Sequence, residues 1–247
     1  MATVPAPVLA PYWPIVYVRG YAMTPAEIAD AVSSPYMGFN VGATKLRQAW
    51  DGQVRRHVFE SPLVRLMKDC GYRDIYTDGT EIVGPVPARS VVIYRYYDSA
   101  DPDLGAGKAP SIVAAAEGLR DLVHRLRVQV CGDDAEALAG FKVHLVAHSM
   151  GGLVCRCFLQ NDAVSTPADR ALVDKVFTYA TPHNGIEMAG LNVPALLGLW
   201  DMNNFNRSVM ADYLGLPAGS ERVDSLDGKF DPQRFFCFVG TNYGDYA

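Results

Sequence analysis

The sequence predicts an α/β fold in which a mostly parallel sheet is flanked by helices. Short apolar or β-branched runs alternate with stretches whose apolar residues recur every three or four positions, and this alternation is typical of parallel sheets. The chain has 247 residues, of which 49% are hydrophobic. That is enough for a large buried core, and we predict a single domain over residues 1–247.

The N-terminal part is predicted to contain one core strand and two helices. The strand lies at residues 15–18. Residues 24–27 (TPAE) have the form of a helix start, with Thr as N-cap, Pro at the first helical position and Glu at the third. A second helix is predicted at residues 61–70, because its apolar residues share one face and Gly71 follows its last turn.

The residues around these helices lack a regular pattern. Residues 31–57 show no clear period, and residues 72–89 contain the glycines and prolines of a loop. We therefore interpret residues 22–89 as an insertion between the first two core strands.

Later elements follow a clearer pattern. A strand is predicted at residues 90–98, which are β-branched and aromatic, and further strands at residues 173–180 and 235–239. Ser111 is the predicted cap of a helix, and His124 on that helix is expected to be partly exposed. The core-facing residues of the helix recur at spacings of three and four: Ile112, Ala115, Ala116, Leu119, Leu122, Val123 and Leu126.

Residues 142–152 contain the most specific motif. An apolar run stops at Ser149, and helically spaced apolar residues follow two glycines. The order of strand, sharp turn and helix is the context of a G-x-S-x-G nucleophile elbow. The side chains two positions before and after the serine are small, as the turn requires: Ala147 and Gly151. Gly152 is expected to let the helix lie close to the strand, and the helix N-terminus suits a developing oxyanion. A chance serine in such a turn is the alternative.

Residues 147–152 (AHSMGG) resemble the nucleophile motif of lipases and esterases of the α/β-hydrolase superfamily. Residues 14–21 (PIVYVRGY) resemble the strand and oxyanion loop of that family, and residues 181–185 (TPHNG) a segment of many bacterial lipases. The resemblance implies an α/β-hydrolase fold with Ser149 as nucleophile. It also implies that the backbone N–H groups of Tyr21 and Met150 bind the oxyanion.

Arg19 stands where the family more commonly has histidine. The backbone donor of the loop is unaffected by this change. A cation at the mouth of the site favours an anionic substrate group. A surface ion pair is the alternative role for Arg19.

A catalytic serine needs a base, and the base needs an acid that orients it. The family order is Ser, acid, His, and no histidine occupies the position of the base. His57 precedes the elbow, His144 and His148 lie on its strand, and His183 lies in the TPHNG segment; His148 is expected to point away from the serine. The acid is Asp245 or a later residue. We expect the chain to be truncated at its C-terminus, before the base; a complete but inactive protein is the alternative.

Residues 186–216 are apolar but irregular, and Pro194 and Gly198 interrupt any long helix. Lipases often carry helices at this place that cover the active site. A lid of this kind would bind acyl or other apolar groups. Ordinary helices packed on the sheet are an equal alternative.

Composition excludes several other classes of protein. The chain has 22 basic and 27 acidic residues, for a net charge of −5, which indicates neither a nucleic-acid partner nor an anionic membrane surface. No apolar stretch approaches the roughly 20 residues of a membrane helix.

Prolines interrupt residues 1–14, so this segment would make a poor signal peptide. We therefore predict a cytoplasmic protein. The five cysteines are irregularly spaced, and we expect reduced thiols rather than a zinc site.

These observations predict a serine carboxylic-ester hydrolase that acts on a small-molecule ester or lipid through an acyl-enzyme on Ser149. No metal or organic cofactor is implied. Acyl transfer to an alcohol on the same fold is one alternative, and a non-catalytic binding protein with a hydrolase fold is another.

Overall fold

The computed structural model describes eight ranges of the chain: residues 11–20, 43–48, 51–59, 62–75, 84–100, 105–188, 191–192 and 203–239. The predicted helix start at residues 24–27 lies outside them.

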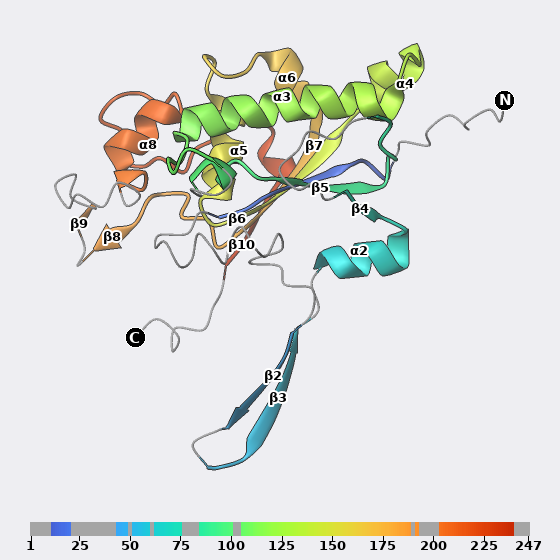
Figure 1. Ribbon diagram of the computed structural model, residues 1–247. Coiled ribbons are helices and arrows are strands. Elements are labelled where there is room, and N and C mark those ends of the chain that lie inside the picture. The colour runs from blue at the N-terminus through green and yellow to red at the C-terminus, as the bar shows by residue number, and fades with distance from the viewer. Residues whose placement is uncertain are drawn as a thin grey trace.

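A six-stranded sheet forms the centre of the molecule (Figure 1). Its strands follow one another across the sheet in this order: β10 (Phe235–Phe238), β7 (Val173–Tyr179), β6 (Val143–His148), β1 (Ile15–Val18), β5 (Ser90–Tyr94) and β4 (Arg73–Ile75). Every neighbouring pair is parallel. The predicted α/β class is therefore confirmed.

The strand order reverses beside β1. From β1 the chain builds β4 and β5 on one side, and then crosses to build β6, β7 and β10 on the other. Val18 at the end of β1 pairs with Ala147 near the end of β6. In open parallel sheets, ligands bind outside the carboxyl ends of the strands at such a switch point. Ser149 directly follows β6, so the order of the strands places it there.

Helices cover both faces of the sheet. α3 (Ile112–Cys131) and α5 (Gly151–Gln160) pack against each other on one face, whereas α2 (Pro62–Cys70) lies on the other side (Figure 1). Alternate residues of β6 are fully buried on the α3 and α5 side, namely Val143, Leu145 and Ala147. On the α2 side, Ile15 and Tyr17 of β1 pack near Leu66 and Met67. This period of two follows from the alternation of side chains along a strand.

The remaining elements do not belong to this sheet. They are the hairpin of β2 (Ala43–Gln48) and β3 (Val54–Phe59), the pair β8 (Glu187–Met188) and β9 (Leu191–Asn192), the helices α4 (Ala135–Gly140), α6 (Pro167–Ala171) and α8 (Arg207–Tyr213), and the 3₁₀ turns η1 (Asp98–Ala100) and η2 (Pro232–Arg234).

α3 confirms the predicted helix. The hydroxyl of Ser111 accepts a hydrogen bond from the N–H of Ala114 at 3.1 Å, which satisfies one of the free donors at the helix start. All seven residues of its predicted apolar face are buried. His124 is partly exposed, as expected, and lies 2.7 Å from Asp169 of α6.

The predictions were wrong for one loop and for the end of one strand. The predicted loop at residues 72–89 contains β4, which pairs with β5 through residues 73–75. Three residues are too few to show a period, so only the neighbouring strand defines this one. The predicted strand 90–98 ends at Tyr94, because Tyr96 and Tyr97 turn into the core and η1 follows.

The described part of the predicted lid is packed into the core. Phe205, Met210 and Leu214 are buried there, the last two completely, which matches the alternative of ordinary packed helices. The residues between 192 and 203 lie outside the described ranges, so a lid formed by them stays a prediction.

Candidate active site

Ser149 occupies a sharp turn between β6 and α5. Its φ of 52° lies in the left-handed region, which only two other non-glycine residues of the described chain adopt, Ala180 and Asp227. This region costs an L-residue roughly 1–2 kcal/mol, so it persists only where the surroundings enforce it. A strained serine at a strand-to-helix turn is the geometry that the sequence motif predicts.

Three glycines leave room for close contacts around this serine. A Cβ on Gly20, after β1, would lie 2.8 Å from the Cβ of Ser149. A Cβ on Gly151 would overlap the carbonyl oxygens of Val18 and Arg19. A side chain at either of these positions would push the turn away from the end of β1.

The third glycine, Gly152, has a different neighbour from the one predicted. A Cβ on it would overlap the side chain of Thr181, which follows β7. The close approach of α5 to the central strand therefore depends on Gly151, and Gly152 makes room for Thr181.

The peptide that joins Ser149 to Met150 lies at the start of α5. Its carbonyl accepts hydrogen bonds from the Thr181 hydroxyl at 2.8 Å and from the Gly152 N–H at 3.0 Å. Within the part of the chain that the structure describes, the Met150 N–H donates no hydrogen bond. It is therefore free to bind an anion at a helix N-terminus. The second predicted donor, Tyr21, lies outside the described residues.

Arg19 is not at an open mouth of the site, and the surface ion pair is also wrong. Its side chain is 1% exposed, and its guanidinium lies 4.8 Å from the centre of the Tyr97 ring. The hydroxyl of Tyr96 donates to its backbone carbonyl at 3.0 Å. The residue is thus an internal cation beside the elbow. A sequence pattern does not show this, because Tyr96 and Tyr97 are distant along the chain.

His148 lies closest in sequence to the nucleophile. Its Nδ1 and the Cβ of Ser149 both lie within 3 Å of the position that a Cβ on Gly20 would occupy. The two side chains therefore flank Gly20. Burial lowers the pKa of His148, and the nearby Arg19 cation lowers it further, so the imidazole is neutral at neutral pH.

The other predicted histidines lie in other surroundings. The Nε2 of His183 lies 2.9 Å from the Thr178 hydroxyl, and the Nδ1 of His144 lies 3.5 Å from Asp174. His57 is on β3, where it pairs with Lys45. Among the described residues, no histidine forms a hydrogen bond with Ser149. Asp245, the candidate acid, lies outside the described ranges.

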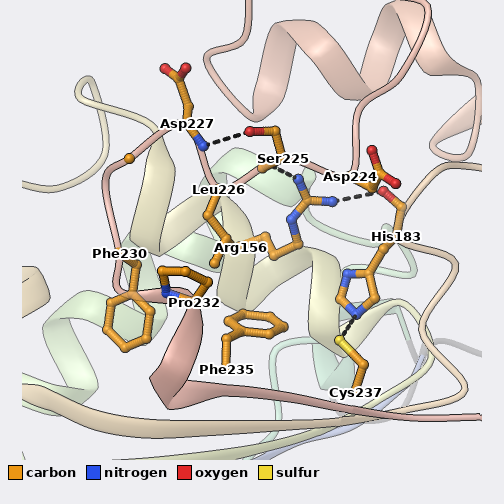
Figure 2. A pocket seen from close by; sticks show the side chains of 11 residues that line it. Arg156, His183, Asp224, Ser225, Leu226, Asp227, Phe230, Pro232, Phe235 and Cys237 are labelled. Carbon is orange, nitrogen blue, oxygen red and sulfur yellow. Dashed lines mark hydrogen bonds between the residues drawn. The ribbon is translucent and has the colours of Figure 1, made fainter.

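A cavity of about 610 Å³ lies beside α5, near β10 (Figure 2). Arg156 of α5 and His183 line it, together with Cys237, which approaches the Nε2 of His183 to 3.5 Å. Burial lowers the pKa of His183 to about 4, and the Arg156 cation contributes to this shift. This histidine is therefore neutral and part of the packing around α5.

Arg156 is the main residue here that sequence reasoning missed. It is 1% exposed, and its guanidinium donates to the Gln160 side chain and to the carbonyls of His183, Val223 and Ser225 at 2.5–2.8 Å. It therefore fixes α5, whose N-terminus follows Ser149, against two loops. The available signal was an arginine surrounded by Cys155, Cys157 and Phe158 on an otherwise apolar helix.

The described residues offer neither a metal site nor a membrane-spanning helix. All five cysteines are free thiols, and the described ranges contain no group of three or more histidine, cysteine or acidic side chains arranged to hold a metal ion. No helix within the same ranges has both the length and the apolar character needed to cross a membrane.

No protein-family model and no curated protein matches the chain. Solved structures do: a cutinase-like protein from Cryptococcus sp. is 12% identical, with a TM-score of 0.37 over 97% of this chain and 80% of that one. Phospholipase PlaB from Legionella pneumophila is 14% identical, with a TM-score of 0.40 over 92% of this chain and 38% of that one. An acetyl xylan esterase is 9% identical, with a TM-score of 0.36 over 93% of this chain and 83% of that one. Because these values are low, a function for this chain rests on the Ser149 turn.

Proposed function

We propose that the protein is a serine ester hydrolase with Ser149 as its nucleophile. The observation that carries the proposal is the φ of 52° at Ser149, in a turn at the carboxyl end of β6 and at the switch point of the sheet. A strained backbone that the surroundings enforce is typical of functional sites. Here it separates the serine from the strand and presents it before the N-terminus of α5.

The reaction follows from the groups in this turn. The Oγ of Ser149 attacks the ester carbonyl and releases its proton to solvent, the carbonyl oxygen becomes an oxyanion, and the leaving oxygen later takes up a proton as the C–O bond breaks. The free N–H of Met150 stabilises this charge as a hydrogen-bond donor, and the resemblance adds the N–H of Tyr21. The alcohol then leaves, and water hydrolyses the acyl-enzyme. Substrates of this reaction are small carboxylic esters or lipids.

An active-site probe tests the proposal. We expect a fluorophosphonate to label the protein at Ser149, as located by mass spectrometry of the modified peptide, and Ser149→Ala to remain unlabelled. Ser165, whose hydroxyl is buried and bonded to the carbonyl of Phe158, provides a matched control variant, Ser165→Ala. Labelling that persists in Ser149→Ala would refute the assignment.

One observation favours a second candidate, a binding protein on the same fold. No described histidine is hydrogen-bonded to Ser149, and a serine without a base is a weak nucleophile. This candidate predicts that an ester binds at the turn without covalent turnover. Release of the alcohol product above the Ser149→Ala background distinguishes the two.

A further inference from the structure

The Ser149 carbonyl and the Met150 N–H belong to one peptide unit. Their directions are opposite and fixed to each other, because a peptide bond is planar. A group that holds the carbonyl therefore also sets the direction of the N–H. Thr181 is such a group, since its hydroxyl donates to this carbonyl at 2.8 Å.

The end of β7 is shaped to bring Thr181 to this position. The carbonyl of Tyr179 accepts the N–H of Ser149 at 2.8 Å. Ala180 then has a φ of 51°, so the chain turns, and the next residue also faces the elbow. The N–H of Ser149 is thus held by Tyr179 and its carbonyl by Thr181. These two residues flank Ala180, which is also in the left-handed region.

The side chain of Thr181 fits closely in this place. It is 8% exposed and occupies the space that a side chain on Gly152 would need. Its rotation is therefore restricted, and the hydroxyl stays directed at the carbonyl. A hydrogen bond to a peptide carbonyl also polarises the peptide and strengthens its N–H as a donor.

We propose that Thr181 is a positioning residue of the oxyanion site, which orients the Met150 N–H through the Ser149 carbonyl. The inference rests on the proposed function of Ser149. A whole oxyanion donor contributes roughly 100- to 1,000-fold to the rate. Loss of its alignment should remove part of this factor, about 10- to 100-fold.

Thr181→Ser and Thr181→Ala provide a matched pair, because they differ by one oxygen atom and both leave room for Gly152. We expect Thr181→Ser to retain the kcat of the wild type on a short p-nitrophenyl ester. Thr181→Ala should lose about 10- to 100-fold in kcat, with KM changed much less, since the oxyanion exists only after attack. Thr178→Ala is the control, because it removes a buried hydroxyl of the same segment that bonds His183 rather than the elbow.

A boronic acid supplies a readout independent of turnover. The Oγ of Ser149 forms a bond to the trigonal boron of phenylboronic acid and gives its proton to solvent, which leaves a tetrahedral boronate anion at the oxyanion site. Boron NMR detects the change from trigonal to tetrahedral. We expect Thr181→Ala to weaken this binding about 10-fold or more and Thr181→Ser to preserve it.

The outcomes separate the inference from the proposed function. A wild-type protein without Ser149-dependent hydrolysis and without boronate binding contradicts the proposed function itself. The role of Thr181 is overturned if the wild type hydrolyses the ester or binds the boronic acid and the Thr181→Ala variant does so equally well. The role is also overturned when Thr181→Ser loses as much as Thr181→Ala, or when Thr178→Ala loses as much, because either result indicates only a packing effect. Urea unfolding of all variants identifies any that do not fold.

Discussion

The Cβ of Ser149 lies so close to Gly20 that any side chain on Gly20 would approach it to 2.8 Å. The loop after β1 and the turn after β6 are therefore in van der Waals contact. These two segments are 129 positions apart in the sequence, yet each limits the choice of residue in the other. The catalytic proposal predicts a measurable cost when this contact is disturbed.

Gly20→Ala should displace Ser149 and abolish its labelling by a fluorophosphonate. Overpacking of a close contact typically costs about 1–3 kcal/mol of stability, so urea unfolding should show a loss of that size. Gly140→Ala is the control, because a Cβ added there would meet no atom within 4 Å and the φ of this glycine is not positive. Equal labelling of Gly20→Ala and wild type would show that the turn tolerates displacement.

Ala180→Gly should stabilise the protein. Glycine adopts the left-handed region without the steric cost of a Cβ, and Ala180 is exposed, so little packing is lost. After the entropic cost of glycine in the unfolded chain is subtracted, we expect a gain of up to about 1 kcal/mol. Ala114→Gly, at an exposed position of α3, should instead lower stability by roughly 0.5–1 kcal/mol. Urea unfolding measures both, and a loss of stability in Ala180→Gly contradicts the prediction.

Stability should fall as the pH drops from 7 to 5. The pKa of His183 is lowered from 6.5 to about 4 in the folded state, so between these values the unfolded chain binds a proton that the folded protein excludes. The loss from His183 should be about 2 kcal/mol between pH 7 and 5. It should level off below pH 4, where both states are protonated.

Comparison of two histidine variants tests this pH dependence. His183→Gln should show a smaller loss between pH 7 and 5 than the wild type, as measured by urea unfolding at each pH. His144→Gln, which leaves His183 in place, should keep the part of the wild-type dependence that comes from His183. Indistinguishable pH profiles for His183→Gln and wild type would contradict the assigned cause. Burial also lowers the pKa of His144 and His148, so some dependence should remain.

Residues 1–247 should hydrolyse a short p-nitrophenyl ester slowly. No described histidine is bonded to Ser149, and a triad that lacks a member retains on the order of 1,000- to 10,000-fold over water. Added imidazole should act as the base that no described histidine provides, and it should accelerate the reaction in the wild type more than in Ser149→Ala. A large loss of turnover in His148→Ala or His183→Ala, with folding intact, would instead identify a base within the chain.

The sequence by itself determined the local parts of this protein. The run from residue 143, the glycines after Ser149 and the following helical spacing are all adjacent in the chain, and they specify a strand, a turn and a helix. The face of α3 follows in the same way from a period of three and four. Local patterns also predicted the parallel sheet, because alternating strands and helices leave few other arrangements. The roles of Tyr21 and Asp245, by contrast, stay predictions.

Only the tertiary structure decided which distant groups meet at the elbow. β4 exists because it pairs with β5, and Arg19 is buried with its guanidinium over the ring of Tyr97. The hydroxyl of Thr181 reaches the Ser149 carbonyl across 32 positions of sequence. A propensity or a spacing describes only neighbouring residues, whereas these contacts depend on how two strands end side by side. The motif around Ser149 can be recognised from its own sequence, but the packing of the whole sheet decides which residues surround it.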